Sequence, residues 1–71
     1  MTLQINGEYR DLADGLTLAA LITQLGSKSD RVAVELNLEI IPRDKWPETV
    51  LRHGDRLEIV HFVGGGNLWA L

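Results

Sequence analysis

One segment of the chain has the spacing of an amphipathic helix. Its apolar residues recur at positions i, i+3, i+4 and i+7, namely Leu18, Leu21, Ile22 and Leu25. Thr17 precedes them where an N-cap oxygen is expected, and Gly26 follows where a left-handed residue ends a helix. The sequence therefore predicts one main helix over about residues 18–25, and its apolar face needs a partner other than a second helix.

Short alternating runs, separated by turn residues, make up most of the rest of the chain. Asn6-Gly7 favours a type I′ turn, so residues 2–11 are predicted to form a hairpin. Further strands are predicted at residues 32–36, 40–41, 49–51 and 56–63, the last being the longest. The proline-bounded segment 42–48 is predicted to be a loop with at most one turn of helix, and its Trp46 is expected to cap the edge of the core.

This order of elements predicts an α+β fold with a mixed sheet covered on one face by the main helix. If the first and last strands are central neighbours, they run parallel through a right-handed crossover. A chain of 71 residues has room for one hydrophobic core. We therefore expect one domain over residues 1–63, followed by a flexible glycine-rich tail over residues 64–71.

Charge and composition exclude several classes of function. The net charge of −3 gives no support for binding nucleic acid or an anionic membrane, and it favours a partner with a basic surface. The chain has no cysteine, and its two histidines, His53 and His61, lack a third ligand, so no metal site is expected. No apolar run approaches the roughly 20 residues that span a bilayer, and no signal peptide is evident, so a cytoplasmic protein is expected.

The glycine run Gly64–Gly66 directly follows the longest predicted strand. A chain without Cβ atoms can enter a narrow channel in an extended form and carry a carboxyl group to a remote active site. Once adenylated with ATP, such a carboxyl becomes an anhydride that sulfur or nitrogen nucleophiles attack. On this interpretation the chain is a carried acyl group and not an enzyme.

Four segments together carry a resemblance to a known family. They are LQINGE, the helix face described above, VAVELNLEIIPRDKW and HGDRLEIVHFVGGG. The most specific part is N-x-E-I-I-P-R-x-x-W followed by G-D-x-x-E-I-V-x-F-V-G-G-G. Over about residues 1–66 the chain resembles the ThiS sulfur carriers of thiamine thiazole synthesis, which implies a ubiquitin-like β-grasp fold.

The resemblance also implies a chemistry and a set of partners. An E1-like enzyme would use ATP to adenylate the terminal glycine, and a sulfurtransferase or cysteine desulfurase would supply persulfide sulfur. The resulting thiocarboxylate would be consumed by thiazole synthase. Carried over by motif, Gly66 bears the reacting carboxyl, while Gly64 and Gly65 thread through the channel. The carrier itself would need no bound cofactor and no catalytic side chain.

This sequence departs from the family pattern because it continues past the diglycine. The carboxyl of Gly66 is tied in an amide to Asn67, and an amide cannot be adenylated as a carboxylate can. Three explanations stay open: a protease removes residues 67–71, the extension is a by-product of the history of the gene or the expressed sequence, or this relative has lost the chemistry. The first is favoured.

The last strand suggests a docking surface. If Leu57 and Ile59 face the helix, alternation places Val60 and Phe62 on the outer face of the sheet. An outward apolar pair next to a threading tail is typical of a partner site. The alternative is a β-bulge near Val60 that turns Phe62 into the core.

Other functions remain compatible with the same residues. The chain could carry sulfur for molybdopterin, cysteine or another metabolite, with the same terminal chemistry. It could be a ubiquitin-like modifier joined through glycine to lysine. It could also be a plain interaction domain whose NLWAL segment is the ligand.

Overall fold

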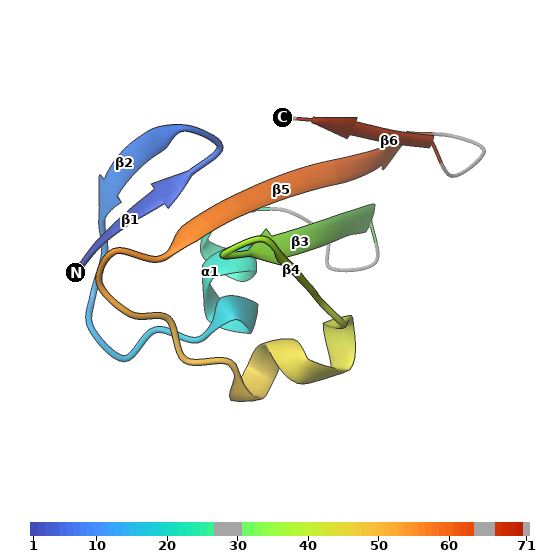
Figure 1. The fold of residues 1–71 in the computed structure, drawn as a ribbon. Helices are drawn as coiled ribbons and strands as arrows, with labels where there is room; N and C mark the ends of the chain where they lie inside the picture. Colours follow the sequence, from blue (N-terminus) through green and yellow to red (C-terminus); the bar gives the residue numbers. More distant parts are fainter. Residues whose placement is uncertain (27–30, 64–66, 71) are drawn as a thin grey trace.

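The computed structural model describes residues 1–26, 31–63 and 67–70 (Figure 1). Its elements, in chain order, are β1 (Thr2–Ile5), β2 (Glu8–Asp11), α1 (Leu18–Gln24), β3 (Val32–Leu36), β4 (Glu39–Ile41), the 3₁₀ helix η2 (Arg43–Glu48), β5 (Arg56–Val63) and β6 (Asn67–Ala70). Neither helix of these ranges is long and apolar enough to cross a membrane.

The sheet is mixed, and β5 lies at its centre. The main strand order is β2-β1-β5-β3-β4. β1 and β5 run parallel, with Ile5 opposite Leu57, while β1 pairs antiparallel with β2 and β3 pairs antiparallel with both β4 and β5. The predicted α+β architecture and the parallel pairing of the first and last predicted strands are confirmed.

The main helix begins at the predicted residue, Leu18, and ends at Gln24, one residue before the predicted end. The Thr17 hydroxyl accepts a hydrogen bond from the Ala20 backbone N–H at 3.2 Å, which satisfies one of the free donors of the first turn. At the other end Gly26 has φ 75°, a conformation that costs little without a Cβ atom. Its N–H donates to the Thr23 carbonyl at 3.0 Å.

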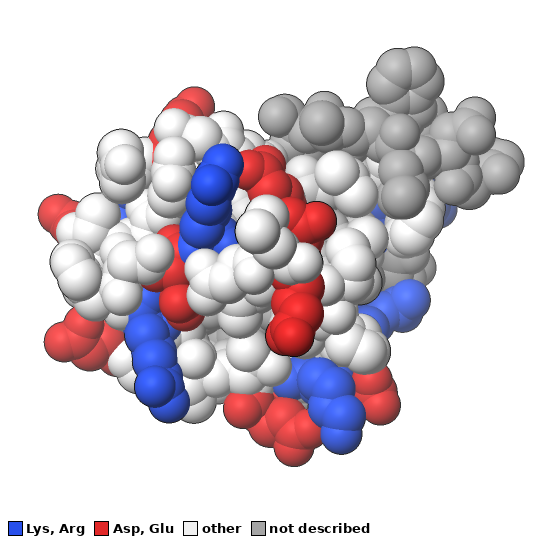
Figure 2. Space-filling model, in the orientation of Figure 1, with Lys and Arg blue, Asp and Glu red and all other residues white. Residues whose placement is uncertain are grey.

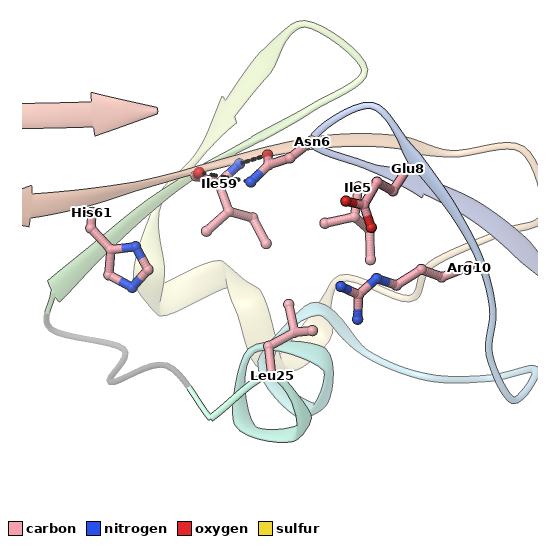
Figure 3. A pocket seen from close by; sticks show the side chains of 7 residues that line it. All are labelled: Ile5, Asn6, Glu8, Arg10, Leu25, Ile59 and His61. Atoms are coloured by element: carbon pink, nitrogen blue, oxygen red, sulfur yellow. Dashed lines mark hydrogen bonds between the residues drawn. The ribbon is translucent and has the colours of Figure 1, made fainter. Parts of the chain in front are cut away.

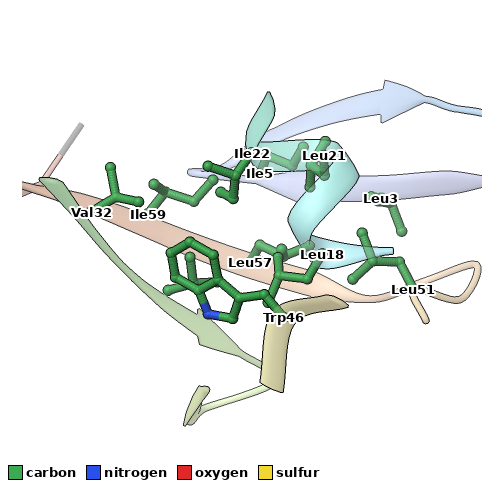
Figure 4. Close-up of a cluster of buried hydrophobic side chains, with 11 residues drawn as sticks. Leu3, Ile5, Leu18, Leu21, Ile22, Val32, Trp46, Leu51, Leu57 and Ile59 are labelled. Atoms are coloured by element: carbon green, nitrogen blue, oxygen red, sulfur yellow. The ribbon is translucent and has the colours of Figure 1, made fainter. Parts of the chain in front are cut away.

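The core lies between α1 and one face of the sheet (Figure 4). Alternate residues of the central strands point toward the helix, as the period of a strand requires. The buried side chains are Leu3, Ile5, Leu18, Leu21, Ile22, Val32, Val34, Trp46, Leu51, Leu57 and Ile59, with Leu25 partly buried against them. The predicted packing of the helix face on the central strands is therefore confirmed.

The segment that follows β4 differs from the prediction. Residues 43–48 form a six-residue 3₁₀ helix, which is two turns instead of at most one. Its Trp46 is 2% exposed, and the indole N–H donates to the Ile41 carbonyl at 2.9 Å. The side chain is thus part of the core, and burying it with its N–H satisfied orders the segment.

The predicted short strand at residues 49–51 was wrong. This segment makes an isolated bridge between Thr17 and Val50, flanked by backbone bonds from Leu18 to Thr49 and from Leu51 to Leu16. It therefore pairs with the chain that enters α1 and not with a strand of the sheet, because burial of Leu51 draws it toward the helix.

Part of the predicted flexible tail is paired in the structure. Asn67–Ala70 form β6, which runs antiparallel to β5, so these four residues do not extend freely from the domain. Residues 64–66 and 71 lie outside the described residues. Pairing is possible here because β1 pairs only with Arg56 and Leu57 and is too short to cover the whole of β5.

Leu21→Ala tests the assignment of the helix face. Leu21 is fully buried, so its truncation is expected to lower the free energy of unfolding by about 2 to 5 kcal/mol in denaturant melts. Gln24→Ala, at an exposed position of the same helix, is the control and should change stability by less than about 0.5 kcal/mol. A Leu21→Ala loss below about 1 kcal/mol would mean that the face is wrongly assigned.

Candidate functional site

The last residues of β5 lead directly into the glycine run, and their two edges are covered unequally. On one edge, β3 pairs with β5 from Leu57 to His61. On the other edge, β1 pairs with Arg56 and Leu57 and then turns away at Asn6-Gly7. From Ile59 onward, β1 therefore leaves this second edge of β5 open.

The Asn6 side chain covers the first open position. Its carboxamide oxygen accepts from the Ile59 backbone N–H at 2.7 Å, and its carboxamide nitrogen donates to the Ile59 carbonyl at 3.3 Å (Figure 3). The Asn6 backbone N–H also donates to the Leu57 carbonyl at 2.9 Å. One side chain thus replaces the next residue of a strand, and the backbone φ of 49° at Asn6, tolerated by asparagine, lets the chain turn at the same residue.

β6 occupies the edge beyond Asn6. Its register places Ala70 opposite Val60, Trp69 opposite His61, Leu68 opposite Phe62 and Asn67 opposite Val63. Val60 and His61 also pair with β3 on one edge of β5. β6 must therefore lie on the opposite edge, where β1 pairs with the first residues of β5. Figure 1 shows β1 and β6 along β5, one near each end.

Val60 and Phe62 lie on the face of the sheet that points away from α1. Both are half-buried, and neither belongs to the buried core that contains Leu57 and Ile59. The pairing of β5 is continuous through Val60 with both β3 and β6, so the alternative of a β-bulge at this point is excluded. Val60 and Phe62 therefore point outward, as alternation along β5 predicts, and their role in docking stays a prediction.

Acidic side chains lie next to this apolar pair. Glu35 of β3 is the register partner of Glu58 of β5, two residues along each strand from the pair Ala33 and Val60 and thus on the same face of the sheet. Like charges directly opposite one another repel, so the arrangement does not stabilise the isolated chain. In Figure 2 acidic side chains occur among basic and uncharged ones over the face in view. The carboxylates suit a partner that brings a basic group to the outer face.

A cavity of about 340 Å³ opens on the helix side of the sheet. Apolar side chains from β1, β5 and the end of α1 form part of it, and polar ones come from Asn6, β2 and His61 (Figure 3). Its lining residues are Ile5, Asn6, Glu8, Arg10, Leu25, Ile59 and His61. The Nδ1 atom of His61 is buried without a hydrogen-bond partner within the described residues. The sequence suggested no role for this cavity.

The structure separates the predicted site residues into two groups. Val60 and Phe62 are placed as described, whereas Gly64, Gly65 and Gly66 lie outside the described residues.

His53 accepts a hydrogen bond at Nδ1 from the Thr2 backbone, and no cluster of three metal-ligating side chains occurs in ranges 1–26, 31–63 and 67–70. The role of Asn6 was missed, because Asn-Gly signals a turn and does not indicate where the carboxamide points.

Comparison with known proteins identifies the family. The model of the ThiS family matches residues 3–66. A crystal structure of the thiamine biosynthesis protein ThiS from Geobacter metallireducens superposes with a TM-score of 0.81 at 33% identity, covering 93% of this chain and all of that one. The predicted β-grasp fold is thereby confirmed.

Two kinds of protein resemble the chain in sequence. The sulfur carrier protein ThiS of Bacillus subtilis is 40% identical over 65 residues, which are 90% of this chain and 98% of that protein. A thiazole synthase of Paramagnetospirillum magneticum is 48% identical over 67 residues, which are 94% of this chain but 21% of that protein. The chain therefore spans about a fifth of the length of this thiazole synthase and of a second one from Magnetococcus marinus.

Substitution of Asn6 tests its role at the strand edge. Asn6→Ala removes both hydrogen bonds to Ile59, and we expect the free energy of unfolding to fall by about 1 to 3 kcal/mol, the cost of leaving partly buried polar groups unsatisfied. Asn6→Gly is the matched variant, because it relieves the positive φ but still lacks the carboxamide. It should also be destabilised in denaturant melts, and a Gly variant as stable as the parent chain would contradict the assignment.

Proposed function

Because the chain belongs to the ThiS family, we propose that it is a sulfur carrier of thiamine biosynthesis, bearing sulfur as a thiocarboxylate on Gly66 and delivering it to thiazole synthase. The observation that carries this proposal is the match of the family model over residues 3–66, which ends at the third glycine. The resemblance to sulfur carriers extends over nearly the whole length of the Bacillus subtilis protein, and this supports the assignment as a carrier.

The proposed chemistry acts on the main chain and needs no catalytic side chain of the carrier. A carboxylate oxygen of Gly66 attacks the α-phosphate of ATP, and pyrophosphate leaves. The outer sulfur of a persulfide, supplied by a sulfurtransferase or a cysteine desulfurase, then displaces AMP from the acyl carbon. A second thiol cleaves the remaining S–S bond, so a disulfide forms and the thiocarboxylate is released. ATP is thus used by the activating enzyme and is not a cofactor of this chain.

The outer face of the sheet is the proposed docking surface for the E1-like activating enzyme. It combines the apolar pair Val60 and Phe62 with the carboxylates of Glu35 and Glu58. Both sets lie on or beside the strand that leads into Gly64, so a partner bound here is close to the entry of the tail. A hydrophobic centre with charged groups around it is the usual composition of a specific interface.

Thiazole synthase is the proposed acceptor of the sulfur. Two thiazole synthases contain a segment similar to this chain within a longer protein, and this association supports a functional link between the two activities. The sulfur of a thiocarboxylate is polarisable and nucleophilic, so it suits attack on an electrophilic carbonyl carbon of the acceptor's substrate.

Removal of the residues after Gly66 is part of the proposal. The bond from Gly66 to Asn67 is an amide in this sequence, and adenylation requires a free carboxylate oxygen. We therefore assign to a protease the step that cuts this bond and exposes the diglycine.

Phe62→Ala tests the docking surface in a chain that ends at Gly66. We expect stability to change by less than about 1 kcal/mol, because the ring lies outside the core, while affinity for the E1-like enzyme falls by at least about tenfold. Val50→Ala, at a 53% exposed position away from β5, is the control and should bind like the parent chain. Unaltered affinity with a markedly lowered melting temperature would show that Phe62 acts in packing instead.

Adenylation itself gives the test of the reacting group. With ATP and an E1-like partner, a chain ending at Gly66 should release pyrophosphate, whereas the chain of residues 1–71 should not, because its Gly66 carbonyl is an amide. Mass spectrometry of the product locates the adenylate. Equal turnover of the two chains with an adenylate at Leu71 would contradict the assignment of Gly66.

A further inference from the structure

Every second residue of β5 directs its backbone N–H and C=O groups to the edge that β1 leaves open. Ile59 directs its N–H and C=O to the Asn6 side chain, so by the alternation of a strand His61 and Val63 direct theirs to the same edge. β6 is the segment that pairs with this edge, with Trp69 opposite His61 and Asn67 opposite Val63. Strand pairing at these residues therefore satisfies backbone groups that neither β1 nor Asn6 reaches.

This pairing is geometrically incompatible with a threaded tail. Register partners in an antiparallel pair have Cα atoms about 5 Å apart, which applies to Val63 and Asn67. Four residue steps of extended chain span about 13 Å. While β6 is paired, Val63 and Asn67 are therefore much closer together than the ends of an extended chain of that length.

We propose that the edge of β5 at His61 and Val63 is a strand-binding site that β6 occupies in cis, and that this occupancy withholds the glycine segment from any enzyme that must bind it extended. The consequence for sulfur transfer rests on the function proposed above, whereas the pairing of β6 and its effect on access to the glycine segment do not. Release of β6, and not only the presence of the extension, then controls when the bond after Gly66 can be cut.

Hydrogen exchange measured by NMR tests the strand pairing. The His61 and Val63 amides should be protected in the chain of residues 1–71 and should exchange at least about tenfold faster in a chain ending at Gly66. Trp69→Pro removes the N–H that faces His61 and should have the same effect. Trp69→Thr is the matched control, since it keeps that N–H and a residue favourable in strands, and should retain protection.

The Val60 amide serves as an internal reference. The same alternation directs it to β3, where Val60 pairs with Ala33, so its exchange should be equal in all four chains. Equal exchange of His61 and Val63 in the long and the short chain would overturn the proposal. Equal loss of protection in Trp69→Pro and Trp69→Thr would also overturn it, because the contact would then depend on the indole and not on the strand.

A disulfide between positions 63 and 67 tests whether paired β6 keeps an enzyme from the glycine segment. The chain has no cysteine, so a Val63→Cys, Asn67→Cys double variant forms a single bridge, and the Cα spacing of paired strands is in the range that a disulfide needs. Subtilisin, used as a probe that binds its substrates extended, should cut residues 64–70 at least about tenfold more slowly in the oxidised than in the reduced form. Equal rates would overturn the proposal.

These outcomes are distinguishable from a failure of the proposed function. If the chain ending at Gly66 is not adenylated, sulfur carriage fails while exchange and cleavage still decide the role of β6. If it is adenylated but the oxidised and reduced forms are cut equally, sulfur carriage stands and the proposed role of β6 is wrong.

Discussion

The pairing of β5 on both of its edges is the interaction on which the rest of this structure depends. β1 joins one edge in parallel and β3 joins the other antiparallel, which places Leu57 and Ile59 at the centre of the sheet beneath α1. A parallel pair requires a crossover connection, and α1 is part of that crossover. The same helix that closes the core is therefore needed to bring the two ends of the domain together.

The two halves of β5 have different roles, since the first half forms the core and the second half has an edge that β1 does not cover. Its first half is paired through β1 and β3, and its inward side chains form the core. Its second half has an edge that β1 does not reach, and there Asn6 and then β6 provide the hydrogen-bonding groups. Because β1 is short, part of β5 has no regular strand partner from it. The strand that precedes the glycine run therefore keeps an edge that β6 can occupy or leave.

Local patterns predicted much of the fold because they were unambiguous. The spacing of Leu18, Leu21, Ile22 and Leu25 admits one helical face, and Asn6-Gly7 admits a tight turn between two short strands. Alternation in residues 56–63 then determined which side chains face inward, so the outward position of Val60 and Phe62 followed.

The features that were missed depend on contacts between distant segments. Residues 49–51 have strand composition, but their partner is the entry to α1. The six residues of η2 are ordered by burial of Trp46, and neither proline predicts this. β6 was expected to be free because glycine precedes it, yet its pairing depends on where β1 ends. Likewise, the carboxamide of Asn6 reaches a residue 53 positions away.

Sulfur carriage on Gly66 can be tested by the intact mass of the protein isolated from its native organism. We expect a chain whose last residue is Gly66, with the mass increase of one sulfur-for-oxygen exchange at its carboxyl group. A chain joined through that glycine to a lysine of another protein, or a chain that retains Asn67 and bears no added sulfur under conditions in which thiamine is being made, would contradict it.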